Sequence, residues 1–303
     1  MKLILSNNQT MKFNDFFTQI QGGKELYDYS GYHDLLFKFD NTLTHPVQFL
    51  NLDTNRRSYQ YSGAYLTGYL NSPDLAFAAA AILKSERIAV ADSELTNAPS
   101  LSKISEAAKL VSHGVLMPKC YGGTKIAIIR AITSEKVTLD FPLIMKLANG
   151  TRGSENYTIF SKNEIFDLLE GKEDSSIWIL QKLVDSDGFF RVNCYYGKPV
   201  YGIFRSLEDA PENLERHHGH MYKPAGGCNA TFLDPYEIPR SVQQAASRAA
   251  KILGRDFAGA DIIVDKYSKR AYVLEINYNP QLVTVESFKD RRIAEFLKAV
   301  EKM

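Results

Sequence analysis

The stretch "YVLEINYNPQL", Tyr272 to Leu282, decides the fold. Its apolar residues predict a buried strand, yet Glu275, Asn277 and Asn279 interrupt it at every second position. Because side chains on a strand alternate between its two faces, these three polar side chains point to the same side. A strand that carries a carboxylate and two amides on one face indicates a functional site.

Composition places the chain among ordinary globular proteins. It has 303 residues, of which 45% are apolar and 23% charged, enough for two domains or for one domain with a large insertion. The 36 basic and 35 acidic residues leave a net charge of +1, so no overall field favours nucleic acid or an anionic membrane. We therefore expect neither a nucleic-acid partner nor a membrane partner.

Cysteine usage and the first residues bear on the compartment. Cys120, Cys194 and Cys228 are odd in number and far apart, which suits neither a disulfide framework nor a zinc site and indicates a reducing compartment. The apolar run at 3–5 is too short for a signal-peptide core or a membrane span. We therefore expect a cytoplasmic protein.

The N-terminal part alternates strand-like and helix-like segments. Apolar runs predict strands at 2–5, 46–52, 63–70 and 87–92. The alanine-rich segment 73–86 begins with proline, as a helix does. This alternation favours an α/β layer with a parallel sheet.

The remainder predicts an α+β arrangement. Strands are expected at 141–147, 177–184, 189–197, 199–205, 259–265 and 271–277. Helices are expected at 101–113, 161–171 and 238–254. Ser161 with Glu164 three residues later forms the capping-box pattern at the start of the second of these helices. A last helix is predicted from one apolar face formed by Ile293, Phe296, Leu297 and Val300.

A polar loop follows the predicted strand in "PLIMKLANGTRGSENY", residues 142–157. Lys146 ends the strand, and Gly150 and Gly153 follow it. Glycines let a backbone approach phosphate oxygens closely, and a lysine supplies a point charge. The stretch lacks the residue order of a P-loop, and short glycine motifs are common in turns, so a purely structural loop stays open as an alternative.

Two neighbouring predicted strands contain the candidate metal ligands. "GADIIVD" (259–265) and "YVLEINYNP" are separated by a loop of hairpin length at 266–270. Paired strands lie about 4.8 Å apart and residues two apart on a strand about 6.6 Å, so Asp261, Glu275 and Asn277 can converge. Oxygen ligands of this kind suit Mg²⁺. A solvated polar face fits either strand alone but fits the pair followed by Asn-Pro less well.

These motifs together resemble the signature of a known family. "DIIVD" followed by "LEINYNP", with "IMKLANGTRG" upstream, is similar to the ATP-grasp superfamily, and especially to the carboxylate–amine ligases that include ribosomal-protein glutamate ligase and glutathione synthetase. The likeness covers roughly 95–303. It implies an ATP-grasp fold of α/β and α+β class, with two α+β lobes around a nucleotide. The implied division is an N-terminal α/β domain at 1–95 and an ATP-grasp domain at 96–303, with a small lid lobe at about 120–185 and a large lobe at about 186–303.

The resemblance also implies roles for individual residues. It assigns the nucleotide phosphates to Lys103 and Lys146, with a closing loop formed by Gly150, Thr151, Arg152 and Gly153. The backbone that reads adenine corresponds to Gln181, Lys182, Leu183 and Val184. Asp261, Glu275 and Asn277 match the ligands of Mg²⁺ or Mn²⁺, with two ions, and Arg205 matches a basic residue facing the transferred phosphate.

The chain departs from the family pattern at several places. Lys182 stands where the family carries an acidic residue, which leaves the ribose to Asp185 or Asp187. The lid loop continues with "SENY" where close relatives have another glycine. The segment before helix 238–254 keeps paired glycines but differs around them, and the resulting candidates for substrate contact are His220, Lys223, Gly226, Gly227 and Asn279.

Several other residues have two possible interpretations each. His217, His218 and His220 have metal-binding spacing, but without nearby cysteines a surface loop or an acceptor contact is favoured over zinc. Arg191 suits phosphate binding or the edge of a sheet. Cys228 lies beside paired glycines, but no nucleophile arrangement accompanies it.

The resemblance implies an enzyme. We expect an ATP- and Mg²⁺-dependent ligase that joins a carboxylate to an amine, with small-molecule or peptide substrates, through an acyl-phosphate intermediate, releasing ADP and phosphate. Two alternatives stay open: a catalytically silent nucleotide-binding regulatory protein, and a kinase that phosphorylates a hydroxyl. The substrates and the oligomeric state are not indicated by the sequence.

Overall fold

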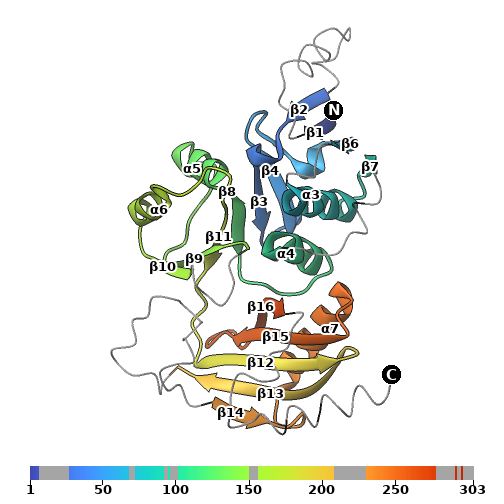
Figure 1. Cartoon of the computed structure of the whole chain (residues 1–303), viewed down its shortest axis with the longest axis vertical. Coiled ribbons are helices and arrows are strands. Elements are labelled where there is room, and N and C mark those ends of the chain that lie inside the picture. Colours follow the sequence, from blue (N-terminus) through green and yellow to red (C-terminus); the bar gives the residue numbers. More distant parts are fainter. Residues whose placement is uncertain are drawn as a thin grey trace. The chain divides into compact units, whose positions relative to one another are not determined.

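Three sheets make up the part of the chain that the computed structural model describes, namely residues 1–6, 27–67, 72–91, 95, 102–149, 156–207, 230–277, 291 and 295 (Figure 1). These residues fall into two compact units. The first unit holds Met1–Gly114 and Lys119–Leu183, and the second holds Val115–Pro118 and the residues from Val184 onward. The predicted α/β and α+β class is confirmed.

A four-stranded sheet in the first unit is parallel throughout. Its order is β2-β1-β6-β7, with bounds Tyr27–Ser30, Lys2–Ser6, Gly63–Thr67 and Ala89–Ala91. Helix α3 (Pro73–Ser85) connects β6 to β7, begins with proline and buries its alanine-rich side. The parallel sheet expected from the N-terminal alternation is therefore present.

The second sheet of this unit has seven strands in the order β10-β9-β11-β8-β3-β4-β5. Their bounds are Asn156–Ile159, Leu143–Leu147, Ile177–Lys182, Cys120–Thr124, Leu35–Phe39, Val47–Asn51 and Arg56–Arg57. The strand expected at 46–52 was wrongly placed in the parallel sheet. It is β4, and it pairs antiparallel with β3 because the short turn between them makes a hairpin, closed by a hydrogen bond from Asp40 N to Pro46 O.

This sheet joins residues from both sides of position 95. Strand β8 pairs with β3 on one side and with β11 on the other. The domain boundaries given above stay predictions, but the sheet shows that residues 35–57 and residues 120–182 share one hydrogen-bonded layer.

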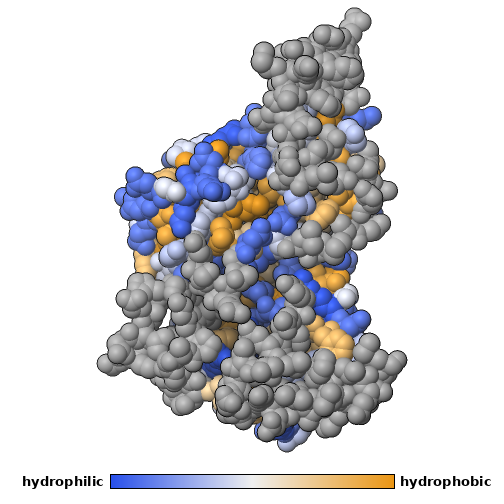
Figure 2. Space-filling model, in the orientation of Figure 1, coloured by the Kyte–Doolittle hydropathy of each residue, from blue (hydrophilic) through white to orange (hydrophobic). Residues whose placement is uncertain are grey.

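Helices cover both faces of the seven-stranded sheet. On one face, α5 (Lys125–Thr133) and α6 (Lys162–Leu169) pack on a core that includes Met145 and the buried Trp178. Hydrophilic residues gather over these two helices on the face shown in Figure 2. On the other face, α4 (Lys103–Ser112) brings Ile104 against Gly122, where any larger side chain would collide with it.

The caps of these helices follow the sequence. Ser161 Oγ accepts a hydrogen bond from Glu164 N, and the Glu164 carboxylate accepts one from Phe160 N, as the capping-box pattern predicts. None of the described helices is long and apolar enough to span a membrane. The helix predicted around Ile293 lies outside the described residues, apart from two isolated positions.

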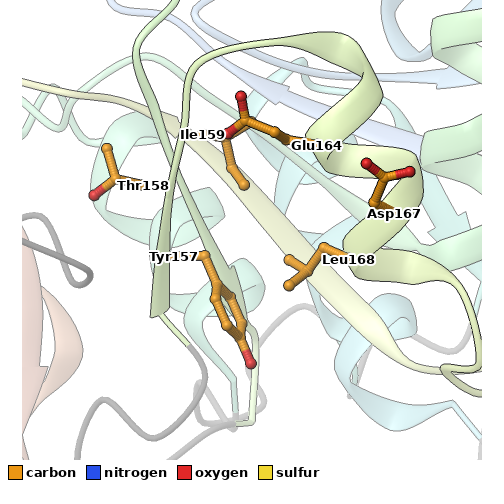
Figure 3. A pocket seen from close by; sticks show the side chains of 6 residues that line it. All are labelled: Tyr157, Thr158, Ile159, Glu164, Asp167 and Leu168. Atoms are coloured by element: carbon orange, nitrogen blue, oxygen red, sulfur yellow. The ribbon is translucent and has the colours of Figure 1, made fainter.

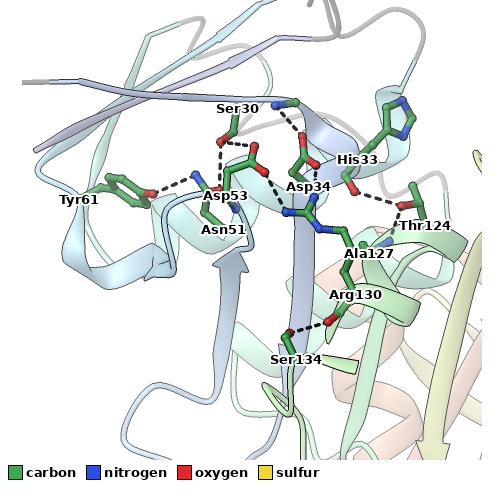
Figure 4. Close-up of polar contacts among 11 residues, drawn as sticks. Ser30, His33, Asp34, Asn51, Asp53, Tyr61, Thr124, Ala127, Arg130 and Ser134 are labelled. Atoms are coloured by element: carbon green, nitrogen blue, oxygen red, sulfur yellow. Dashed lines mark hydrogen bonds and ion pairs between the residues drawn. The ribbon is translucent and has the colours of Figure 1, made fainter. Parts of the chain in front are cut away.

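A polar network ties α5 to the loops beside β3 and β4 (Figure 4). Arg130 on α5 donates to Asp34 at 2.6 Å and to Asp53 at 3.0 Å. Burial raises the pKa of Asp34, the Asp53 charge adds to the rise, and Arg130 opposes it. The arginine therefore offsets the repulsion between two carboxylates that the fold brings together.

The second unit is built on a five-stranded antiparallel sheet in the order β14-β13-β12-β15-β16. Its strands are Ala230–Leu233, Lys198–Ser206, Gly188–Tyr195, Phe257–Val264 and Ala271–Asn277. Helix α7 (Arg240–Leu253) packs on one face, and Gly254 ends it in the left-handed conformation, with φ +66. The strands and the helix expected here are confirmed.

The face that α7 covers can be identified from the sheet register. Ile238, just before α7, lies against Gly202, and Gly202 pairs with Val192. Val192, Ala260 and Ile276 form the fully buried apolar side of the sheet. On each of these strands, the residues directly before and after the buried one therefore point to the opposite face, away from α7.

The first prediction concerns the close approach of β12 and β13. A Cβ atom at Gly188 would collide with the backbone oxygen of Arg205 and lie 2.6 Å from the Phe204 ring, so Gly188→Ala should reduce the free energy of unfolding by about 3 kcal/mol. Urea unfolding measures this. Gly63→Ala is the control, because its Cβ meets nothing closer than 3.7 Å. Equal midpoints for the two variants would contradict the close approach.

Candidate functional site

One row of charged residues crosses three strands of the second unit's sheet. Arg191 on β12 is directly opposite Asp261 on β15, and Asp261 is opposite Glu275 on β16. Asn277 is two residues after Glu275 and lies on the same face, the one turned away from α7. The structure thus brings together the three residues that the sequence predicted to converge.

Asp261 is the centre of this cluster. Its side chain is almost fully buried, and its carboxylate accepts hydrogen bonds from Arg191 Nε at 2.7 Å and Arg191 Nη2 at 2.6 Å. Asn277 Nδ2 donates to the same carboxylate at 3.1 Å. A bidentate arginine–carboxylate pair of this length is a strong, charge-assisted interaction. The Asp261 charge raises the pKa of Arg191 further, against the effect of its burial, so the guanidinium stays charged.

A bulge shapes the strand pairing next to the cluster. The register shifts between Asp261 and Ile262. Asp261 pairs with Glu275 and the next residue, Ile262, pairs with Val273, so Leu274 has no partner on β15. A bulge adds twist and re-aims the side chains beside it. The hairpin loop at 266–270 fixes the rest of the register, which is why the sequence predicted the pairing of these two strands.

Arg205 lies on the same face, on the neighbouring strand. It is half-buried on β13 opposite Phe189, and its guanidinium lies 5.8 Å from the centroid of that ring. Because Ile203 is opposite Arg191, the two arginines are diagonal neighbours on β12 and β13. The face therefore combines two carboxylates with two guanidinium groups.

The lysines predicted to bind phosphate lie in the first unit, near the end of β9. Lys146 is buried on β9, and its Nζ donates to Gln181 Oε1 at 3.0 Å. Lys103 is the first residue of α4, and its Nζ donates to Ala148 O at 3.2 Å, just after β9 ends. Both ammonium groups thus lie where the strand enters the predicted lid loop.

Cys120 lies beneath this pair. It is opposite Gln181 in the sheet and completely buried, which raises the pKa of its thiol to about 12 even though the Lys146 charge acts in the other direction. Cys194 in the second unit is also buried, and burial raises the pKa of its thiol to about 12. Neither thiol is a nucleophile at neutral pH.

The segment predicted to read adenine ends β11. Gln181 is buried and Lys182 exposed, while the backbone N–H of Lys182 donates to Lys119 O. Leu183 N donates to Pro142 O, and Val184 is buried. Asp187, a ribose candidate, forms an exposed ion pair with Lys266 at 3.2 Å.

Several predicted site residues lie outside the described part of the chain. They are Gly150, Thr151, Arg152, Gly153, His220, Lys223, Gly226, Gly227 and Asn279. Their roles stay predictions, as do those of the described residues.

Comparisons with known proteins bear on the resemblance. No protein-family model matches the chain. A probable alpha-L-glutamate ligase of Aeromonas salmonicida is 27% identical over 164 residues, 52% of this chain and 51% of that protein. The chain is similar to probable glutamate ligases. It spans about half the length of the curated relatives it matches.

Solved structures of ligases match almost the whole chain. D-alanine–D-alanine ligase from Bacillus anthracis has a TM-score of 0.48 at 17% identity and covers 99% of this chain and 95% of its own. The ATP-grasp ligase PsnB, solved with a precursor variant, Mg and ADP, has a TM-score of 0.44 at 13% identity and covers 98% of each chain.

One buried polar residue of the charged face was not singled out from the sequence. Asn193 lies two residues after Arg191 in "FFRVNCYYG", and its only sequence signal is a polar position inside an apolar strand.

A separate hollow of about 290 Å³ lies in the first unit between β10 and α6 (Figure 3). It is lined by Tyr157, Thr158, Ile159, Glu164, Asp167 and Leu168, and none of the predicted site residues lines it.

A second prediction follows from the Arg191–Asp261 pair. Arg191→Met leaves the buried Asp261 carboxylate with the neutral Asn277 amide as its partner among the described residues of this face, so the free energy of unfolding should fall by about 3–5 kcal/mol. Urea unfolding at pH 7 measures it. Lys266→Met, which breaks the exposed pair with Asp187, should leave the midpoint unchanged. Equal shifts in the two variants would show that Asp261 does not depend on Arg191.

Proposed function

We propose that the protein is an ATP- and Mg²⁺-dependent ligase that forms an amide bond between a carboxylate and an amine. The observation that carries the proposal is the face that presents Asp261, Glu275 and Asn277 beside two arginines. The similarity of the chain to a probable alpha-L-glutamate ligase and to ATP-grasp ligases supports the same reaction class.

The residues of this face fit Mg²⁺ in donor type. Asp261 and Glu275 supply carboxylate oxygens and Asn277 an amide oxygen, the hard ligands that Mg²⁺ takes together with substrate phosphates. Because Arg191 and Arg205 balance the two carboxylates, the fit rests on the donor atoms and on the substrate phosphates that would accompany the ion. Bound there, Mg²⁺ would neutralise phosphate charge as phosphoryl transfer begins.

The reaction has two steps in which atoms balance. A carboxylate oxygen of the first substrate attacks the γ-phosphorus of ATP, the bond from the γ-phosphorus to the bridging oxygen breaks, and ADP leaves. The amine nitrogen of the second substrate then attacks the acyl carbon, inorganic phosphate leaves with the carboxylate oxygen, and the nitrogen gives up a proton. Two easier steps replace one hard one.

The chain's own groups act mainly by charge and position. Lys103 and Lys146 would bind phosphate oxygens, and Arg205 and Arg191 would stabilise the phosphoryl group in transfer. Phosphoryl transfer needs no protein nucleophile. The two described cysteines, both protonated and buried, are consistent with that requirement.

The amine is proposed to be an amino acid or a peptide, with glutamate the first to test because the curated relative is named a glutamate ligase. The assay measures ADP and inorganic phosphate with ATP, Mg²⁺ and pooled amino acids and short peptides. Equal amounts of ADP, phosphate and amide support the ligase. ADP with a phosphorylated product and no free phosphate would indicate a kinase, and no ADP with any substrate a silent nucleotide-binding protein.

The third prediction tests the carboxylate opposite Asp261. Glu275→Gln removes one negative charge and keeps the side chain's shape, so substrate-stimulated ADP release should fall about 100-fold or more, and Mn²⁺ binding measured by calorimetry should weaken. The melting temperature should stay unchanged. The exposed Glu173→Gln is the control and should keep wild-type turnover. Wild-type rates in Glu275→Gln would exclude Glu275 from the metal site.

A further inference from the structure

Asn193 places a buried amide on the face that carries the proposed metal ligands. It lies two residues after Arg191 on β12, so both side chains point away from α7. Its register partner on β15 is Gly259, and Gly259 is opposite Asn277 on β16. Asn193, Gly259 and Asn277 thus form a second row directly beside the charged row.

The Asn193 amide oxygen is an acceptor without a donor. The residue is 2% exposed, and its Oδ1 has no hydrogen-bond partner within the described part of the chain. Buried amide oxygens are normally paired, because an unpaired one loses its hydrogen bonds to water and gains nothing in return. An amide in this state destabilises the empty protein, which points to a role in binding a ligand.

The neighbouring donors on this face form hydrogen bonds with other groups. Arg191 directs Nε and Nη2 to Asp261. Asn277 Nδ2 donates to Asp261 at 3.1 Å and reaches Gly259 O at 3.5 Å. Gly259 has no side chain, and no hydrogen bond joins Asn193 Oδ1 to Tyr201, its partner on β13, among the described residues. A donor from a ligand would complete the pairing.

We propose that Asn193 Oδ1 accepts a hydrogen bond from an N–H group of the amine substrate. This inference rests on the proposed function and deepens it. Among the groups of the proposed reaction, the phosphate and carboxylate oxygens are acceptors only, whereas the amine carries N–H donors. Arg191 and Asn193 are about 6.6 Å apart along the strand, so an amine held by Asn193 lies close to the phosphoryl group that Arg191 faces.

A neutral amide suits this task. It accepts a hydrogen bond from the amine without removing a proton. Unlike a carboxylate, it does not favour the protonated ammonium form, in which the nitrogen lone pair is unavailable for attack. Asn193 would therefore orient the nucleophile and select substrates with a free N–H, while the nucleotide and metal are bound by other residues.

The first test uses the empty protein and needs no substrate. Asn193→Leu keeps a similar shape and removes the unpaired acceptor, so the melting temperature should rise by about 2 °C or more. The matched control is Asn51→Leu. Asn51 is also fully buried, but its amide accepts from Ser30 Oγ and Asp53 N and donates to Tyr61 OH (Figure 4), so this variant should melt at a lower temperature. A lower melting temperature for Asn193→Leu would show a structural role and overturn the inference.

The second test separates the amine from the nucleotide. In Asn193→Leu, the KM for the amine that stimulates ADP release best should rise about 10-fold, while the KM for ATP and the Mn²⁺ affinity of the free protein stay within about twofold of wild type. An unchanged amine KM overturns the inference. A change of similar size in the ATP KM or in Mn²⁺ affinity overturns it as well, because Asn193 would then belong to the nucleotide or metal site.

The two proposals fail in different ways. If no amine stimulates ADP release by the wild-type protein, the proposed function fails and the amine contact with it. If the wild-type protein forms amide and Asn193→Leu keeps its KM for the amine, the proposed function stands and only the role of Asn193 is wrong.

Discussion

The antiparallel pairing of β15 with both β12 and β16 is the constraint on which the proposed site depends. It sets Arg191, Asp261 and Glu275 in one row across three strands, although Arg191 and Asp261 are 70 residues apart in the sequence. A shift of one residue in either pairing would send Asp261 or its partners into the apolar layer under α7. The buried Val192, Ala260 and Ile276 resist such a shift, because each would have to move to the polar face.

The same pairing explains how a buried carboxylate is retained. Desolvation of Asp261 is offset by the bidentate contact with Arg191 and by the Asn277 amide. Glu275 is only half-buried and makes no side-chain hydrogen bond within the described ranges, so it remains available to a cation. The cluster thus keeps the Asp261 carboxylate tightly held and the Glu275 carboxylate open.

Much of the second unit could be predicted from the sequence because its signals are local. The alternation in "YVLEINYNP" and the short loop before it fix the β15–β16 hairpin and the convergence of Asp261, Glu275 and Asn277. The capping box at Ser161 and the start of α3 at Pro73 are likewise local patterns, and the structure has both.

Other features depend on contacts between distant segments. Strand β8 was not predicted, because "CYGGT" has no apolar alternation; its glycines are needed where Ile104 and the Leu35 backbone pack closely against the strand. The assignment of β4 to the antiparallel sheet depends on its pairing with β3, a strand that was not predicted although its residues are mostly apolar. Asn193 was missed because its unpaired state depends on Gly259, a register partner far along the chain.

The most direct test of the central claim follows the oxygen of the carboxylate substrate. With that carboxylate labelled with a heavy oxygen isotope, the protein is incubated with ATP, Mg²⁺ and the amine, and the products are analysed by mass spectrometry. Activation as an acyl phosphate predicts one heavy oxygen in each inorganic phosphate released and the other in the amide, whose mass equals the labelled acid plus the amine less one water that carries the heavy oxygen. Unlabelled phosphate, or ADP formed without any amide, would contradict the account.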